Sequence, residues 1–159
     1  MESTARNVVL LGATGSIGEN TLAVIAAHPG RFRLLGAAAH SNAEALRGIA
    51  QRFEVPHTRL FNESGMEGLV ELASLPEADV IVVATTGTVG LHPMLAALDA
   101  GKVVALASKE VLVVGGEAVM EAVKKRPGRL LPVDSEHNAL FQCLDGREDG
   151  KGVRRLLLT

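Results

Sequence analysis

The sequence predicts an α/β fold, a doubly wound and mostly parallel sheet with helices on both faces. Short β-rich runs alternate with helical patterns along the chain, which is typical of parallel strands joined by right-handed crossovers. Runs such as Val80-Ile81-Val82-Val83 are apolar throughout, and such strands indicate a sheet that is covered on both faces. The chain has 159 residues with 47% hydrophobic and only 3% aromatic content, so Ala, Val and Leu are expected to fill one compact core.

Seven strands are expected, with helices in most of the gaps between them. Their predicted bounds are Asn7 to Leu11, Phe32 to Ala37, His57 to Phe61, Asp79 to Ala84, Lys102 to Leu106, Arg129 to Val133 and Val153 to Leu158. Helix punctuation supports these limits. Ser16 and Glu19 have the spacing of a capping box, Pro29-Gly30 is expected to end the first helix, and Pro127-Gly128 is expected to end a helix that begins near Gly116.

Composition argues against a membrane or nucleic-acid protein. The apolar runs at Val80 to Ala84 and Val103 to Ala107 are too short to cross a bilayer, and Met1 to Thr4 lacks the regions of a signal peptide, so a cytoplasmic location is expected by default. A net charge of −2 with few aromatic residues offers neither a basic face nor a stacking platform for nucleic acid. The single cysteine, Cys143, sits in an apolar helical pattern, so we expect burial rather than catalysis.

A glycine-rich segment, Gly12-Ala13-Thr14-Gly15-Ser16-Ile17-Gly18, follows the first predicted strand and opens the first helix. Glycines there let backbone amides approach a pyrophosphate at the positive end of a helix, and Thr14 and Ser16 add hydroxyl donors. The plain alternative is a tight strand-to-helix turn. The placement directly after an apolar strand favours phosphate binding, as in Rossmann-like domains, although the G-x-x-G-x-x-G spacing differs from the usual fingerprint.

The end of the second predicted strand bears on cofactor choice. NAD-dependent enzymes usually place an acid there to bind the ribose hydroxyls, whereas here His40, Ser41 and Asn42 follow the strand and the first acid is Glu44. A 2′-phosphate would meet no repulsion, and Ser41, Asn42 or a protonated His40 is able to donate to it. The alternative that Ser41 or Asn42 caps the next helix is compatible with this role.

Small residues follow the fourth predicted strand, from Ala84 to Gly90. Ligands of such folds bind outside the carboxyl ends of the strands, where the strand order switches. This segment is therefore expected to line the cofactor groove, or else to form only a loop.

Two further segments carry charges at the same predicted edge. Lys109 follows the fifth strand, and from its spacing alone it would be solvated. Asp134 and Glu136 are two residues apart, and an extended backbone there would place both on one side, able to share a hard cation such as Mg²⁺ or Mn²⁺. Taken without other information, helix capping by Asp134 and an exposed Glu136 are the simpler interpretation.

Three blocks in register resemble the N-terminal, cofactor-binding part of the 1-deoxy-D-xylulose 5-phosphate reductoisomerase family. They are Gly12 to Gly18, Ala107-Ser108-Lys109-Glu110, and Leu131 to Asn138 with its Asp-Ser-Glu-His-Asn core. The resemblance implies a parent enzyme of non-mevalonate isoprenoid biosynthesis that rearranges and reduces 1-deoxy-D-xylulose 5-phosphate to 2-C-methyl-D-erythritol 4-phosphate. It implies NADPH and a divalent metal, Mn²⁺ or Mg²⁺, as cofactors, and a homodimer.

The same resemblance implies roles for individual residues. NADPH would be bound by Gly12, Thr14, Gly15, Ser16, Ile17, His40, Ser41, Asn42, Ser108 and Glu110. Lys109 and Ser135 would bind the phosphosugar substrate, Asp134 and Glu136 would bind the metal, and Lys109, Asp134 and Glu136 would be catalytic. His40 and Ser41 depart from the family's glycine and basic residue, so only a modest preference for NADP is expected, with Arg47 as a compensating charge. Ser108 replaces the family's asparagine.

Enzymes of this family continue well beyond the length of this chain. We therefore expect residues 1–159 to form an NADPH-binding domain that ends at the start of the catalytic region, without the C-terminal catalytic and helical domains, and to be inactive alone. The alternatives are a non-catalytic nucleotide-binding module, or the cofactor domain of another two-domain NADP-dependent dehydrogenase. A semialdehyde dehydrogenase would need a catalytic cysteine, which the position of Cys143 does not offer.

Overall fold

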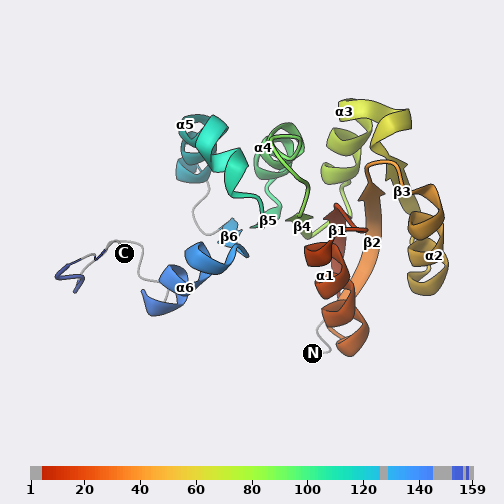
Figure 1. Cartoon of the computed structure of the whole chain (residues 1–159), viewed down its shortest axis with the longest axis horizontal. Helices are drawn as coiled ribbons and strands as arrows, with labels where there is room; N and C mark the ends of the chain where they lie inside the picture. The colour runs from red at the N-terminus through yellow and green to blue at the C-terminus, as the bar shows by residue number, and fades with distance from the viewer. Residues whose placement is uncertain (1–4, 126–128, 145–151, 156, 158–159) are drawn as a thin grey trace.

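The computed structural model describes residues 5–125, 129–144, 152–155 and 157. Strands and helices alternate through this part of the chain (Figure 1). In order they are β1 (Arg6–Leu11), α1 (Ser16–Ala27), β2 (Phe32–Ala39), α2 (Ala43–Phe53), β3 (His57–Leu60), α3 (Phe61–Ala73), β4 (Val80–Val83), α4 (Leu91–Asp99), β5 (Val103–Leu106), α5 (Lys109–Lys125), β6 (Leu130–Pro132) and α6 (Ser135–Cys143). Among the described helices none combines the length and the apolar content that a bilayer crossing requires.

The strands form one six-stranded sheet in the order β3-β2-β1-β4-β5-β6, and every neighbouring pair is parallel. The chain moves outward from β1 to β3, returns through α3 to β4 on the other side of β1, and then moves outward again. The strand order therefore switches between β1 and β4, which confirms the predicted doubly wound fold.

Alternate residues of the central strands feed two separate cores, because successive side chains in a strand point to opposite faces. Val9 and Leu11 pack with the buried residues of α3, α4 and α5, and the neighbouring Val8 and Leu10 pack with those of α1 and α2. Figure 1 shows α3, α4 and α5 together along one face of the sheet. The expected covering of both faces is thus present around β1, whose Val9, Leu10 and Leu11 are fully buried.

The helix after β5 begins earlier than predicted. It starts at Lys109 rather than near Gly116, because the apolar run after Lys109 is already helical and buries Val111 against the sheet. The backbone leaves helical geometry at Gly115, with φ −113° and ψ 15°. A Cβ at Gly115 would lie 2.4 Å from Leu91 Cδ1, so the glycine lets α5 approach α4 closely. The predicted end at Pro127-Gly128 lies outside the described residues.

Three smaller predictions were wrong. The capping box is absent, because Gly15 occupies the N-cap of α1 and Ser16 is already inside the helix. The third strand ends at Leu60, and Phe61 begins α3. The described residues of the predicted seventh strand, 153–155 and 157, are not in a strand, and in the described chain β6 pairs with β5 alone. The rest of that predicted strand lies outside the described residues.

Cys143 is exposed, so its predicted burial was wrong. Its helix, α6, packs mainly against the short edge strand β6, and none of its residues is buried within the described part of the chain. Leu140 and Phe141 of the same helix remain 54% and 42% exposed. The apolar pattern correctly indicated a helix, but a pattern cannot say whether anything covers the apolar face.

Candidate functional site

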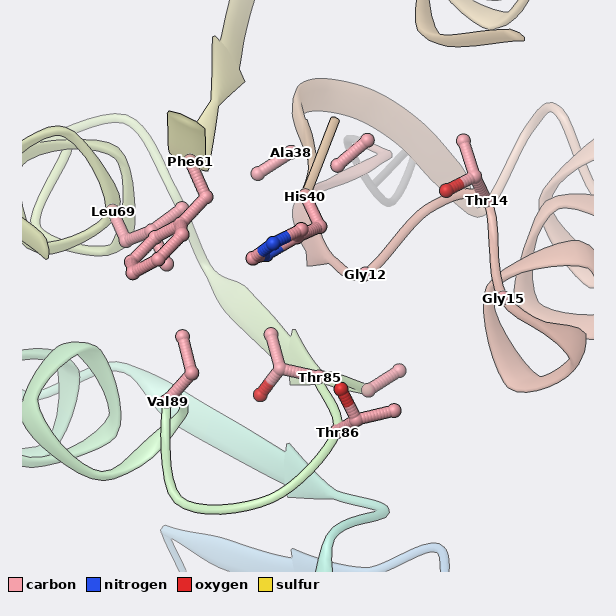
Figure 2. A pocket seen from close by; sticks show the side chains of 12 residues that line it. Gly12, Thr14, Gly15, Ala38, His40, Phe61, Leu69, Thr85, Thr86 and Val89 are labelled. Atoms are coloured by element: carbon pink, nitrogen blue, oxygen red, sulfur yellow. The ribbon is translucent and has the colours of Figure 1, made fainter. Parts of the chain in front are cut away.

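A cleft opens at the carboxyl edge of the sheet, at the switch in strand order between β1 and β4 (Figure 2). Its cavity volume is about 180 Å³. It is lined by Gly12, Thr14, Gly15, Ala38, Ala39, His40, Phe61, Leu69, Ala84, Thr85, Thr86 and Val89. These residues come from the ends of β1, β2 and β4, from the start and middle of α3, and from the segment between β4 and α4. This is the location at which open α/β sheets bind their ligands.

The three glycines after β1 serve different purposes. Gly12 has a φ of +92°, and a Cβ there would lie 2.3 Å from the carbonyl oxygen of Ala84. A Cβ at Gly18 would lie 2.3 Å from the carbonyl oxygen of Gly12. Both residues are therefore required for the turn and for the approach of α1 to it. A Cβ at Gly15 would meet nothing closer than 3.6 Å, so the fold tolerates a side chain there and the exposed surface of Gly15 is available to a ligand.

The first turn of α1 points its backbone amides toward this turn. Gly15 is the N-cap, and no side chain caps the helix. The first N–H groups of a helix have no partner within it, and the helix dipole makes this end positive. Ser16 and Ile17 are exposed and follow Gly15, which lines the cleft. The positive end of a helix beside an uncapped glycine turn suits an anionic group such as a phosphate.

The end of β2 contributes an aromatic pair to the cleft. The imidazole of His40 stacks on the ring of Phe61, with centroids 5.3 Å apart and planes inclined by 24° (Figure 2). The backbone N–H of Asn62 donates to the carbonyl oxygen of His40 at 3.1 Å, which fixes the start of α3 against the end of β2. Phe61 was missed by the sequence analysis as a site residue. Its position directly after β3, at the same edge as His40, was the available signal.

Asn42 caps α2, as one of the two interpretations of the sequence proposed. Its Oδ1 accepts from the backbone N–H of Ala45 at 3.0 Å. Asn42 and Ser41 are exposed and lie beside the cleft rather than in its wall. Glu44, the first acid after β2, lies in the first turn of α2 and is also outside the wall.

Thr85 places a buried hydroxyl in the cleft wall. Its Oγ1 has no hydrogen-bond partner among the described residues. An unsatisfied buried hydroxyl costs about 1–3 kcal/mol, so it favours a ligand with a polar group at this position. The open surface of Gly15 and the unpaired hydroxyl of Thr85 both fit a polar, anionic ligand such as a dinucleotide.

A second group of predicted residues lies at the ends of β5 and β6. Ser108 is buried, with 3% of its surface exposed. Its Oγ lies 3.0 Å from the carbonyl oxygen of Gly87 and 3.1 Å from Oε2 of Glu110. Both partners are acceptors, so the single hydroxyl proton serves one of them at a time. Ser108 thereby links the segment that lines the cleft to the first turn of α5, and its hydroxyl is already engaged within the protein.

The carboxyl of Glu110 is held in its ionised form. Its pKa is lowered by a hydrogen bond from its own backbone N–H, by the Ser108 hydroxyl and by the charge of Lys109, while burial opposes these effects. Lys109 and Glu110 are exposed at the start of α5.

Glu136 is likewise held ionised at the start of α6. The Ser135 hydroxyl donates to Glu136 Oε2 at 2.6 Å and is the main cause of its lowered pKa, followed by the backbone N–H of Glu136. The charge of Lys109 lowers the same pKa. Asp134, Ser135 and Glu136 therefore lie together at the turn into α6, where the helix begins at Ser135 and Asp134 is its N-cap.

Asp134 occupies the N-cap of α6, but its side chain makes no capping hydrogen bond. Its Oδ1 is buried and has no hydrogen-bond partner in the described part of the chain, since the contact with His137 Nδ1 at 3.5 Å is too long for a hydrogen bond. Asn138 donates from Nδ2 to the carbonyl oxygen of Pro132 at 2.7 Å and braces the turn between β6 and α6. Among the residues that the structure describes, no cluster of three or more His, Cys, Asp or Glu side chains is arranged to hold a metal. Asp134 and Glu136 can therefore supply only part of a metal's ligands.

A glycine turn beneath a helix N-terminus, at the switch point of a doubly wound parallel sheet, defines a dinucleotide-binding domain of the Rossmann type. The family model described as 1-deoxy-D-xylulose 5-phosphate reductoisomerase matches residues 8–64 and 57–116. The chain belongs to this family.

The similar proteins match the chain over almost its whole length. The reductoisomerase of Geobacillus kaustophilus is 47% identical to this chain, and the match covers 96% of this chain and 44% of the length of that protein. The solved reductoisomerase from Zymomonas mobilis, in complex with NADPH, is 38% identical with a TM-score of 0.81, over 87% of this chain and 41% of its own. A solved reductoisomerase in complex with NADPH, fosmidomycin and magnesium is 38% identical with a TM-score of 0.80, and the match covers 87% of this chain and 38% of that one. The chain spans less than half the length of these relatives.

Proposed function

We propose that the chain is the NADPH-binding portion of a 1-deoxy-D-xylulose 5-phosphate reductoisomerase. The main support is the glycine turn at the switch point, where Gly12 and Gly18 are needed by the fold but Gly15 is open to a ligand. A similar solved protein holds NADPH. In the parent reaction, 1-deoxy-D-xylulose 5-phosphate would be rearranged and reduced to 2-C-methyl-D-erythritol 4-phosphate, and NADPH would supply the hydride.

Residues in and beside the cleft would divide among the parts of the cofactor. Gly12, Gly15 and the backbone amides of Ser16 and Ile17 would hold the pyrophosphate, with added donors from the hydroxyls of Thr14 and Ser16. His40, Ser41 and Asn42 would serve the adenosine ribose and its 2′-phosphate. Glu110 would serve the nicotinamide side, and the buried Ser108 would position both Glu110 and the cleft segment at Gly87.

NADPH is expected to bind more tightly than NADH, because the cleft wall contains no acid to bind the ribose hydroxyls and to repel a 2′-phosphate. The expected ratio of dissociation constants is modest, about tenfold, which corresponds to one charge-assisted hydrogen bond. Calorimetric titration of the chain with each nucleotide measures this ratio. Equal affinities, or tighter binding of NADH, would contradict the prediction.

Asp134 and Glu136 are proposed as ligands of a divalent metal, Mn²⁺ or Mg²⁺. The unpaired, buried Oδ1 of Asp134 and the ionised Glu136 form an oxygen donor set that suits such ions, and a similar solved protein holds magnesium. The metal would act as Lewis acid and template for the rearrangement. Ser135 would donate to the substrate, and the Lys109 ammonium would bind its oxygens beside the nicotinamide.

The remaining expectations belong to the same proposal. The phosphosugar substrate is supported by fosmidomycin in a similar solved protein, and a homodimeric parent and a cytoplasmic location are proposed with it. The described residues hold only two carboxylates of a metal site, which favours a chain that binds nucleotide but is inactive alone. A nucleotide-binding module without catalytic activity of its own is therefore the second candidate function for the chain.

A further inference from the structure

We propose that His40 sets the preference for a 2′-phosphorylated cofactor and makes this preference depend on pH. In its protonated form the imidazole would pair with the 2′-phosphate, while Phe61 holds the ring in place from its other side. The inference rests on the proposed function, because it assigns one residue of the same cleft to one group of the dinucleotide.

The position of His40 is the first support. It follows β2 directly, where other dinucleotide-binding domains place the residue that reads the ribose. Among the twelve residues that line the cleft, all of them within the described chain, His40 alone has a titratable side chain. Any side-chain charge that the cleft wall presents to a 2′-phosphate therefore comes from this imidazole.

The stacking of His40 on Phe61 is the second support. With ring centroids 5.3 Å apart, Phe61 supports one face of the imidazole beside the cleft, as Figure 2 shows. The hydrogen bond from Asn62 N–H to the carbonyl oxygen of His40 fixes the backbone as well. A residue that is already positioned loses little conformational entropy when it pairs with a ligand. An exposed histidine without such a partner would be a weaker anchor.

No other charged side chain near His40 takes over its role at the cleft. Glu44 lies in the first turn of α2. Arg47 lines a separate hollow with Glu63 of α3, and the positive charge of Arg47 is offset there by the negative charge of Glu63. Arg59 of β3 lies 3.4 Å from Glu71. The residues that the glycine turn and the segment from Thr85 to Val89 contribute to the cleft wall are glycine, threonine and valine, and none of them is charged.

The direction of the pH effect follows from these charges. The imidazolium exists below the range in which histidines titrate, and only the charged form makes a charge-assisted pair with phosphate. The preference for the phosphorylated nucleotide is therefore greatest at low pH and falls as the pH rises through that range. The 2′-phosphate itself gains charge near pH 6, as phosphate monoesters do, which partly offsets the effect and makes a histidine-free control necessary.

The test compares NADP⁺ with NAD⁺, the acid-stable oxidised forms, by calorimetry at about pH 5.5 and about pH 8, on either side of histidine titration. For the unmodified chain, the dissociation constant of NAD⁺ divided by that of NADP⁺ should fall about five- to tenfold from the lower to the higher pH. In His40→Gln this ratio should be low and nearly the same at both pH values. His28→Gln, altered at the opposite end of α1, should behave like the unmodified chain.

A second measurement does not depend on the variants. The ring-proton NMR signals of His40 should shift more when NADP⁺ binds than when NAD⁺ binds, because only the former brings a 2′-phosphate to the imidazole. Phe61→Leu should weaken NADP⁺ binding about threefold through loss of the stack.

The outcomes separate this inference from the proposed function. A pH-independent ratio in the unmodified chain, an unchanged pH dependence in His40→Gln, or equal NMR shifts with both nucleotides would overturn the role of His40 while leaving nucleotide binding intact. If neither nucleotide binds at either pH, the proposed function fails as well.

Discussion

Replacing Gly15 with Val is expected to abolish binding of NADPH and NADH while the chain stays folded. A Cβ at Gly15 meets no atom closer than 3.6 Å, so the fold accepts it, but the branched side chain would occupy the exposed surface that the pyrophosphate needs. We expect affinity to fall on the order of 100-fold or more, which is about 2.7 kcal/mol. Calorimetry measures the loss, and circular dichroism with thermal unfolding reports the fold.

Gly12→Ala is the matched contrast to this variant. Its Cβ would lie 2.3 Å from the carbonyl oxygen of Ala84, at a φ of +92°, so the substitution should destabilise the fold itself. The expected loss is about 1–3 kcal/mol or more in the free energy of unfolding. A folded Gly15→Val chain with undiminished affinity would reduce the whole segment from Gly12 to Gly18 to a structural turn.

In a full-length parent protein, of the same length as the relatives, Asp134→Asn or Glu136→Gln is expected to remove most reductoisomerase activity. The affinity for NADPH should be retained. Each substitution removes a charged oxygen ligand of the proposed metal and leaves the cofactor cleft unchanged. The loss in kcat/KM should be on the order of 100-fold or more. Glu121→Gln, on the exposed part of α5 and 3.7 Å from Lys125, is the matched control and should stay active.

The 159-residue chain alone should show no turnover and only weak Mn²⁺ affinity, measured by electron paramagnetic resonance. Two carboxylates cannot complete a roughly six-coordinate shell, so water would fill the balance. Measurable turnover by this chain would show that the described residues hold more of the active site than we propose. Near-normal activity of both full-length variants would remove Asp134 and Glu136 from the metal site.

The central strands were predictable because they are continuous apolar runs. Val80 to Val83 reads as a strand covered on both faces, and the structure has β4 at these residues. Helix limits were harder, because they depend on neighbours that the local pattern does not contain. The close approach of Leu91 to Gly115 depends on a neighbouring helix, and the exposure of Cys143 reflects how little of α6 the edge strand β6 covers.

The candidate site was predictable where it depends on backbone placement. The glycine turn, the end of β2 and the segment after β4 all follow strands, so a parallel sheet gathers them at one edge. Contacts between side chains from distant elements could not be predicted in this way. The stack of His40 on Phe61 and the link from Ser108 to Gly87 exist only because the sheet order brings those elements together.

The central claim is that the turn from Gly12 to Gly18 binds the pyrophosphate of NADPH. The most direct measurement is a titration of the ¹⁵N-labelled chain with NADPH, followed through its assigned backbone amide resonances. We predict saturable shifts centred on the amides of Gly15, Ser16 and Ile17, with a second set near His40. Saturable shifts confined to other parts of the sheet, or no shifts at millimolar NADPH, would contradict the account.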